Sequence, residues 1–248
     1  LEVEKKLGLD GKDQIEKYGV EPFIEQCKES VWKYEGMWED FSHTVGFWAD
    51  MKNPYVTYHN DYIESEWWAL KEIWNKGLLY EGHKIVPYCP RCGTPLSSQE
   101  VAQGYKDVKE RSAVVRFKVK GEDAYILAWT TTPWTLPSNV ALCVNPDEDY
   151  VKVTSKGYTY YMAAALVDTV LGEGAEVLEH YQGKDLEFKE YEPLFPYAEK
   201  RIGNKKAYYV VCDTYVTLTD GTGVVHIAPA FGEDDSKVGH RYDLPFVQ

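Results

Sequence analysis

The most distinctive segment of the chain reads Trp129-Thr130-Thr131-Thr132-Pro133-Trp134-Thr135-Leu136-Pro137-Ser138-Asn139. It follows an apolar run that begins at Tyr125. Since proline cannot donate to a strand ladder, the pattern predicts a buried β-strand that ends in a rigid loop lined by hydroxyl groups. Such a loop can present hydroxyls and free backbone N–H groups to a small ligand. The alternative is a plain turn beside residues that simply form strands well, and this segment alone leaves both interpretations open.

A second unusual segment lies near the C-terminus and reads Gly221-Thr222-Gly223-Val224-Val225-His226-Ile227-Ala228-Pro229-Ala230-Phe231-Gly232-Glu233-Asp234-Asp235. The glycines predict a tight turn into a strand, which Pro229 ends before an acidic helix start. This arrangement would bring His226 on the strand and Asp235 in the first helical turn to one cavity. The alternatives are a hydrogen-bonded core histidine and acidic residues that only stabilise a helix terminus.

From about Gly104 onward the chain has the texture of many short strands with one or two helices, which predicts a closed or nearly closed barrel. The expected strands are 114–119, 125–129, 140–144, 150–154, 158–162, 176–180, 186–191, 206–211 and 223–227, with a short helix at 163–171.

Residues 1–86 are expected to be helical. Apolar residues recur at helical spacing between Lys12 and Phe41, and Gly19 and Pro22 are expected to divide this region into two helices. A further helix is expected from Asp61, as its cap, to Gly77. Six of the eight tryptophans precede residue 80. This is more aromatic surface than these helices can bury against each other, so it packs on a further domain or stays exposed.

A short motif, Cys89-Pro90-Arg91-Cys92-Gly93, separates the two regions. Its spacing points two thiolates at one metal, which is half of the four-ligand set of a structural zinc site. The other three cysteines are isolated. A redox motif would need a strand–helix context that is missing here, and an inert turn is the remaining alternative. We therefore expect a helical region at 1–86, a zinc half-site at 87–103 and a barrel domain at 104–248.

Composition narrows the function classes. The chain has 248 residues, a net charge of −13 and 44% hydrophobic residues. No apolar run approaches the roughly 18 residues of a membrane span. The acidity is spread along the chain, which disfavours extensive binding to a nucleic-acid backbone, although not contact with a short nucleic-acid end. Five mostly isolated cysteines predict a reducing compartment such as the cytoplasm. The first residue is not Met, and we expect a fragment of a longer protein.

Several catalytic motifs are missing from the sequence: Gly-x-Ser-x-Gly, His-Glu-x-x-His, Gly-Lys-Ser/Thr phosphate loops and Gly-x-Gly-x-x-Gly. A covalent nucleophile is therefore poorly supported. The two unusual segments instead offer a carboxylate, an imidazole and several hydroxyls. These groups suit recognition and hydrolysis of a small aminoacyl ester through positioning and electrostatics.

Both unusual segments resemble the signature stretches of the editing domain of isoleucyl-tRNA synthetases, and Pro87–Ser98 and Asp61–Ser65 resemble the connective region that flanks it. The related valyl and leucyl enzymes typically have Arg where this chain has Thr132. The resemblance implies an α+β fold, with a helical connective region followed by a β-barrel editing domain and a few peripheral helices. The family's ATP-binding signatures, His-Ile-Gly-His and Lys-Met-Ser-Lys-Ser, are missing. Synthesis of aminoacyl-tRNA from isoleucine and ATP is thus expected of the parent enzyme and not of this fragment.

The resemblance also implies an activity, the hydrolysis of valine wrongly attached to the isoleucine tRNA, and of valyl-adenylate. This amino-acid pair is itself the standard example of weak discrimination by one methylene, which a second pocket corrects. In the family's pattern Asp235 would bind the α-ammonium group and His226 would exclude isoleucine. Trp129 and Asn139 would contribute to substrate binding, Asn139 in a supporting role. The ester and the water would be held by Thr130, Thr131 and Thr132.

The expected partners are the 3′ end of the isoleucine tRNA carrying valine, valyl-adenylate and the remainder of the synthetase, with no membrane. No cofactor is expected for editing. Zinc is expected in the full-length enzyme, where the family's second Cys-x-x-Cys lies beyond the editing insert, so Cys89 and Cys92 would supply only half of the site. The competing function is a non-catalytic module that binds a tRNA end or a protein, because no strong nucleophile is present.

Overall fold

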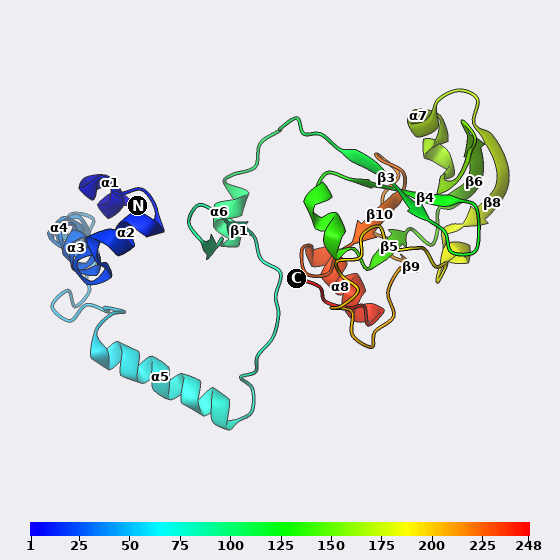
Figure 1. Ribbon diagram of the computed structural model, residues 1–248. Coiled ribbons are helices and arrows are strands. Elements are labelled where there is room, and N and C mark those ends of the chain that lie inside the picture. The colour runs from blue at the N-terminus through cyan, green and yellow to red at the C-terminus, as the bar shows by residue number, and fades with distance from the viewer. The chain divides into compact units, whose positions relative to one another are not determined.

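A computed structural model describes all 248 residues (Figure 1). The chain divides into two compact units, Leu1–Gln103 and Gly104–Gln248. Helices dominate the regular structure of the first unit, although 45–59 and 76–97 contain none, and the second unit is built mainly from strands. The α+β fold class expected from the sequence is confirmed. None of the helices combines the length and the apolar character that a membrane crossing needs.

The first unit contains six helices and one small hairpin. They are α1 (Glu2–Leu7), α2 (Lys12–Tyr18), α3 (Val20–Trp32), α4 (Glu35–Thr44), α5 (Asn60–Asn75) and α6 (Ser98–Ala102), with the strands β1 (Tyr88–Cys89) and β2 (Thr94–Pro95).

The prediction of two helices between Lys12 and Phe41 was wrong, because the structure has three. Gly19, at φ +111°, separates α2 from α3. Pro22 lies in the first turn of α3, where its missing N–H costs no helical hydrogen bond, so it does not break the helix. The second interruption, at Lys33 and Tyr34, carries neither glycine nor proline, which explains why the sequence pattern did not reveal it.

Helix α5 is capped two residues earlier than the sequence predicts. Its N-cap is His59, and Asp61 lies inside the first turn, where its charge favours the helix dipole without capping it. Its C-terminal end agrees with the prediction, since Gly77 adopts φ +68° and donates to the Trp74 carbonyl at 2.8 Å. A capping box lies at Ser97 and Glu100, at the start of α6.

The first unit buries little apolar surface. Val3 is its one buried hydrophobic residue, while Trp67, Trp68 and Trp74 of α5 are 72%, 66% and 65% exposed. This agrees with the expected excess of aromatic surface over what these helices can cover.

The second unit contains eight strands. They are β3 (Ala113–Lys118), β4 (Tyr125–Thr130), β5 (Ala141–Val144), β6 (Asp149–Ser155), β7 (Tyr158–Ala163), β8 (Glu176–Gln182), β9 (Tyr209–Cys212) and β10 (Val224–Ile227). The helical segments are η1 (Pro133–Ser138), η2 (Ala164–Leu166), α7 (Val167–Leu171), η3 (Gly183–Leu186) and α8 (Glu233–Arg241).

Strand β4 is the branch point of the sheet, whose order is β8-β6-β7-β4-β10-β5-β9, with β3 paired to β4. β3 runs antiparallel along all of β4. β7 pairs with the first residues of β4, and β10 pairs with it in parallel at Trp129. The strands β3, β4, β10, β5 and β9 thereby curl into a partial barrel (Figure 1).

The gap between β9 and β3 is bridged by the segment after η3. Tyr191 bridges to Val119, and Glu190 bridges to Tyr209. The prediction of a regular strand over 186–191 was wrong: Leu186 ends a 3₁₀ turn, and Phe188 has φ +66°, which interrupts a strand ladder. Single bridges therefore connect the barrel's two edges where a full strand was expected.

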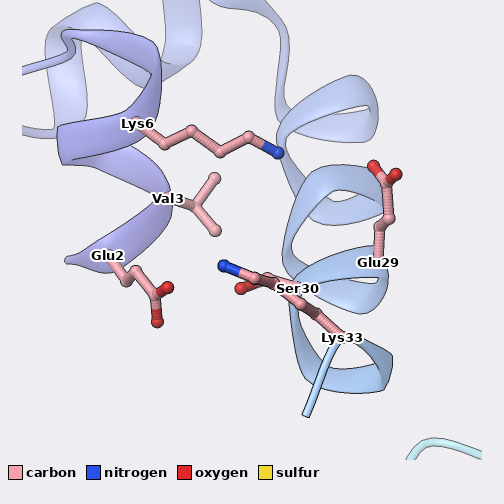
Figure 2. A pocket seen from close by; sticks show the side chains of 6 residues that line it. All are labelled: Glu2, Val3, Lys6, Glu29, Ser30 and Lys33. Carbon is pink, nitrogen blue, oxygen red and sulfur yellow. The ribbon is translucent and has the colours of Figure 1, made fainter.

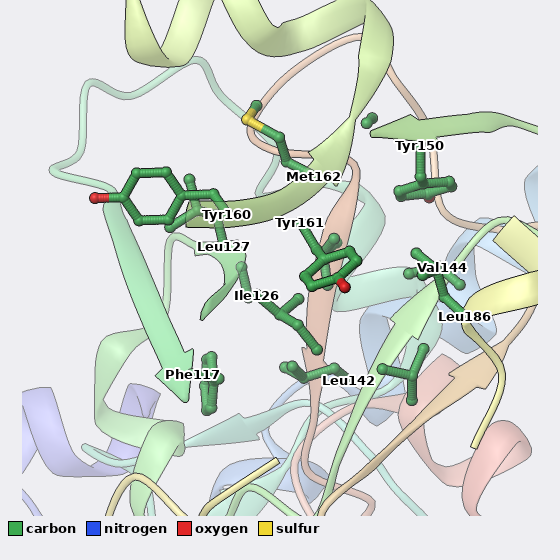
Figure 3. Packing of buried hydrophobic residues seen from close by; sticks show 14 of the residues in the cluster. Phe117, Ile126, Leu127, Leu142, Val144, Tyr150, Tyr160, Tyr161, Met162 and Leu186 are labelled. Atoms are coloured by element: carbon green, nitrogen blue, oxygen red, sulfur yellow. The ribbon is translucent and has the colours of Figure 1, made fainter. Parts of the chain in front are cut away.

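Two packed clusters hold the second unit together. The larger one gathers Phe117, Ile126, Leu142 and Val144 with side chains from β6 and β7 (Figure 3). The smaller one packs Val238 of α8 against Val140 and its neighbours on β5 and β9. Tyr150 is fully buried, and its hydroxyl donates to the Gly223 carbonyl at 2.6 Å, which ties β6 to the turn before β10.

A partly buried ionic cluster connects the β3–β4 turn to the rest of the barrel. The Glu122 carboxylate accepts bonds from Lys152 Nζ at 2.6 Å, Lys189 Nζ at 3.2 Å and the Tyr161 hydroxyl at 2.9 Å. Burial opposes ionisation of Glu122, but the bonds from Lys152, Tyr161 and Lys189 outweigh it and lower its pKa to about 2. Since Lys189 belongs to the bridging segment, this cluster supports closure of the barrel.

We predict that Glu122→Gln destabilises the protein at pH 7. The lowering of the Glu122 pKa from 4.5 to about 2 corresponds to roughly 3 kcal/mol, and screening at a side chain 26% exposed reduces this to about 1–2 kcal/mol. A depressed carboxyl pKa stabilises above pH 4.5, and the contribution is lost as pH falls towards 2. Urea unfolding at pH 7, 5 and 3 measures the free energy of unfolding of the two proteins. The difference between them should become smaller as the pH falls. Glu173→Gln, at an exposed carboxyl, is the control, and a pH-independent difference would contradict the assignment.

Candidate functional site

A cavity of about 260 Å³ lies where β4 and β10 run side by side. The two segments singled out in the sequence form its walls, because Val225 of β10 pairs directly with Trp129 of β4. It is lined by Trp129, Thr130, Thr131, Thr132, Thr135, Val225, His226, Phe231, Gly232 and Asp235. Of the site residues expected from the sequence in this unit, Asn139 alone does not line it.

The threonine loop is more ordered than a plain turn. After β4 the chain enters η1, with Pro133 as its first residue. The Thr132 N–H donates to Thr130 Oγ1 at 3.0 Å, and Thr135 returns two bonds to the Thr132 carbonyl, from its N–H at 3.1 Å and from its hydroxyl at 2.8 Å. The exposed hydroxyl of Thr131 makes no bond within the protein. Thr131 thus offers the cavity a hydroxyl that is free to bind a ligand.

His226 is both a core histidine and a wall of the cavity. It is 8% exposed, and its Nε2 lies 3.0 Å from Thr135 Oγ1. Since that hydroxyl donates to the Thr132 carbonyl, it accepts from Nε2–H, which leaves Nδ1 unprotonated. Nδ1 is buried and has no hydrogen-bond partner. Burial lowers the pKa of His226 to about 4, so the ring is neutral at pH 7.

The role of Thr135 was missed in the sequence. Thr135 follows Thr132 by three residues, in a helical segment that begins with Pro133. This spacing is the sequence signal that the Thr135 side chain turns back towards Thr132. That turn places its hydroxyl between the Thr132 carbonyl and the imidazole of His226.

Asp235 is the one carboxylate in the cavity lining. It lies in the first turn of α8, whose N-cap is Gly232, and its Oδ2 accepts from the Ala228 N–H at 2.9 Å. Burial raises its pKa to about 6, against the opposing effect of the Ala228 hydrogen bond. At pH 7 it is therefore predominantly an anion that is short of partners, which suits binding of a cation.

Three glycines give the two segments the room to meet. A Cβ on Gly221, at φ +76°, would lie 2.8 Å from Trp129 Cβ. A Cβ on Gly223, at φ +71°, would lie 2.4 Å from that of Ala163. On Gly232 it would lie 3.0 Å from Asp235 Cγ. A side chain at these positions would force the turn away from β4 or displace the carboxylate.

Asn139 supports the cavity from outside. It is 4% exposed, its Nδ2 donates to the Ala141 carbonyl at 2.8 Å, and its Oδ1 accepts from the Tyr191 hydroxyl at 2.6 Å. Both ends of the amide are therefore used within the protein. These bonds fix the end of η1 to the barrel, and the amide does not face the cavity.

Cys89 and Cys92 lie in the first unit, on the β1–β2 hairpin. The Cys92 N–H donates to Cys89 Sγ at 3.3 Å and lowers the pKa of that thiol, and Gly93 completes the turn at φ +66°. This turn suits two ligands of a tetrahedral metal. The structure holds no group of three or more His, Cys, Asp or Glu side chains that could complete such a site.

A second cavity, of about 150 Å³, lies between α1 and α3 (Figure 2). Two glutamates and two lysines line it together with Val3 and Ser30. Lys6 already bonds to Gln26 at 3.3 Å, and Glu2 accepts from Tyr34 at 3.0 Å. The two glutamates and two lysines of this second cavity have no net charge, so they favour neither an anion nor a cation. The barrel cavity is therefore the better candidate for a ligand site.

A family model described as tRNA synthetases class I (I, L, M and V) matches residues 1–220. The chain belongs to this family. It is 62% identical to an isoleucine–tRNA ligase of Clostridium acetobutylicum and 60% identical to one of Clostridium novyi, in each case over 100% of this chain and 24% of the relative. The resemblance to isoleucyl-tRNA synthetases expected from the sequence is confirmed, and the chain spans about a quarter of the length of these relatives.

A solved structure described as the P. knowlesi cytosolic leucyl-tRNA synthetase editing domain is also similar to the chain. The TM-score is 0.43 and the identity 14%, over 57% of this chain and 66% of that one.

The raised pKa of Asp235 predicts that this residue weakens the fold at neutral pH. Because the folded-state pKa, about 6, exceeds its ordinary value of 3.8, the stability is highest below pH 3.8 and falls as pH rises to 6. Asp235→Asn keeps an acceptor for the Ala228 N–H and removes the charge, so we expect it to stabilise the protein by about 1–2 kcal/mol at pH 7. Thermal or urea unfolding measures this. Asp234→Asn, at its exposed neighbour, should change little, and a destabilised Asp235→Asn variant would refute the assignment.

Proposed function

We propose that the barrel unit hydrolyses valine wrongly attached to the isoleucine tRNA. The observation that carries this proposal is the convergence of Asp235, the threonine hydroxyls and a neutral His226 on one small cavity. An aminoacyl ester presents a cationic ammonium group, an ester carbonyl and a side chain, and the cavity has a complementary group for each. The identity to isoleucine–tRNA ligases supports this choice of amino acid and tRNA.

In this proposal, Asp235 binds the α-ammonium group of the ester. A partly buried carboxylate that accepts from the Ala228 N–H and faces the Tyr215 hydroxyl has acceptor capacity left for such a cation. The hydroxyls of Thr131 and Thr132 hold the ester end and orient the attacking water, while Trp129 and Val225 cover it. This assigns the hydrolysis to positioning and to preorganised polar groups.

His226 acts here as a wall and not as a base. The ring is neutral, its Nε2–H is bound to Thr135, and Nδ1 is buried away from solvent. A ring fixed in this way sets the depth of the side-chain pocket, so valine fits and isoleucine, with one more methylene, is rejected. The same pocket would accept valyl-adenylate, which presents the same ammonium group and side chain.

The wider assignments are part of this proposal. The parent enzyme, about four times as long as this chain judging by its relatives, would ligate isoleucine to its tRNA with ATP in the cytoplasm. Cys89 and Cys92 would hold a structural zinc ion there together with ligands outside these residues. Editing itself would need no cofactor. The remainder of the synthetase would supply most of the contacts with the tRNA.

The proposal predicts that the chain deacylates valyl-tRNA(Ile), and that the rate follows ionisation of Asp235. After subtraction of spontaneous hydrolysis, kcat/KM should rise between pH 5 and pH 7, with its half-maximum near pH 6, because only the anion binds the ammonium group. Asp235→Asn should lose about 100-fold, since removing one partner of a charge pair costs roughly 2–5 kcal/mol. Asp234→Asn should retain the activity.

The competing function is a module that binds a tRNA end without chemistry. It predicts that valyl-tRNA(Ile) binds to the chain with no release of valine above background, even with the protein in large excess. At pH 7, the unaltered chain and Asp235→Asn would then bind valyl-tRNA(Ile) with equal affinity, and neither would release valine. This result would favour the binding module over hydrolysis.

Selectivity provides a separate prediction. His226→Ala should deepen the pocket and allow isoleucyl-tRNA(Ile) to be hydrolysed, narrowing the preference for valine by about tenfold or more, the value of one methylene in an apolar pocket. The measurement is deacylation of the two aminoacyl-tRNAs in parallel. An unchanged preference in a folded His226→Ala variant would remove His226 from this role.

A further inference from the structure

Two cations of β3 and three tyrosines of β4 and β7 form a cluster outside the cavity lining. The Arg116 guanidinium lies 4.9 Å from the centroid of the Tyr158 ring and 5.5 Å from that of Tyr125. Lys118 Nζ lies 4.7 Å from the Tyr125 centroid. Tyr160 completes the cluster, 6.2 Å from Tyr158 between ring centroids. We call these five residues the Arg116 patch.

Arg116 is a cation without an acidic partner. Lys118 is paired with Asp123, whereas no carboxylate lies within ion-pair distance of Arg116, and the groups that face it are the hydroxyls of Tyr160 and Tyr158. Arg116 is exposed, and Tyr158 is 46% exposed. In a chain of net charge −13, an exposed guanidinium within 6 Å of two aromatic ring centroids is a local site for an anion and a planar group.

The strand register connects this patch to the cavity. Val114 pairs with Trp129, and Lys118 pairs with Tyr125. Because alternate residues of a strand share a face, Trp129 and Tyr125 point to the same side of β4, about 13 Å apart along the strand. On β3, Val114 lies on that face opposite Trp129 and is 48% exposed, whereas Leu127, opposite Arg116 on β4, is buried. Figure 3 shows the Tyr160 hydroxyl turned away from the packed side chains.

We propose that the Arg116 patch binds the single-stranded 3′ end of the RNA whose terminal ester occupies the cavity. A base stacks on the exposed Tyr158 ring, and Arg116 contacts a phosphate of the same strand. Sequence-tolerant binding of single strands combines these two contacts, an aromatic platform and a cation that follows the backbone. This inference rests on the proposed function, since it takes the RNA end to be the group that delivers the ester.

A binding measurement tests the patch without requiring hydrolysis. The probes are two fluorescein-labelled RNA hairpins, one with a four-nucleotide single-stranded 3′ end and one blunt, followed by fluorescence anisotropy against salt. Arg116→Gln and Tyr158→Ala should each weaken binding of the first hairpin by about 5- to 10-fold, in the range of one stacked base or phosphate contact. Arg116→Gln should also reduce the slope of log affinity against log salt by about 0.7.

Matched variants separate the patch from general effects. Arg201→Gln removes the same charge from an exposed position in the loop before β9 and should change neither affinity nor slope. Arg116→Lys keeps the charge and loses the planar contact, so it should retain the salt slope while binding more weakly. Unfolding curves confirm that each variant is folded.

The patch would be refuted if Arg116→Gln bound the overhanging hairpin as tightly as Arg201→Gln does, or if the two hairpins lost affinity equally. Deacylation assays with two substrates distinguish failure of the patch from failure of the proposed function. Valyl-adenosine ends at the nucleoside and does not reach the patch, so Arg116→Gln should hydrolyse it normally while its KM for valyl-tRNA(Ile) rises. If the unaltered chain hydrolyses neither substrate, the proposed function fails, and the binding measurement still decides on the patch.

Discussion

The parallel contact between β4 and β10 is the constraint on which the site depends. It joins two segments that are about a hundred residues apart, at the single pair Val225 and Trp129. The turn before β10 must pass closely over Trp129 and Ala163, which glycine alone permits at positions 221 and 223. Once the strands are paired, the hydroxyls that follow β4 and the carboxylate that follows β10 face one cavity. Neither segment forms a site without the other.

The polar groups of the cavity are fixed before any ligand arrives. Thr135 links the threonine loop to His226, and Asn139 links the end of that loop to Tyr191 in the core. The burial that holds His226 neutral also raises the pKa of Asp235, so one carboxylate remains as the main unbalanced charge of the cavity. This unbalanced charge lowers the stability of the folded protein, and binding of a cation restores that stability. Such a balance is typical of functional sites.

The sequence revealed much of this organisation because both segments break local rules. Three adjacent hydroxyls before two prolines, and a histidine in an apolar strand before an acidic helix start, are unusual for structural segments, and the structure brings them together. The helices of the first unit and most strands of the second followed from periodicity, and the α+β fold from the family resemblance. What could not be predicted depends on tertiary packing: the positive φ of Phe188 that reduces a strand to bridges, the interruption at Lys33, and the internal use of the Asn139 amide. Cation–tyrosine contacts across β3, β4 and β7 likewise require the register.

In the function proposed above, the cavity recognises an aminoacyl ester through the charge of its ammonium group. Calorimetry with non-hydrolysable amide analogues of valyl-adenosine, with and without the α-amino group, tests this most directly. We expect the valyl analogue to bind at pH 7 and to lose about tenfold or more in affinity without its amino group, the effect of one charge-assisted hydrogen bond. The Asp235→Asn variant should bind both analogues equally weakly. Equal binding of both analogues to the unaltered chain would contradict the account.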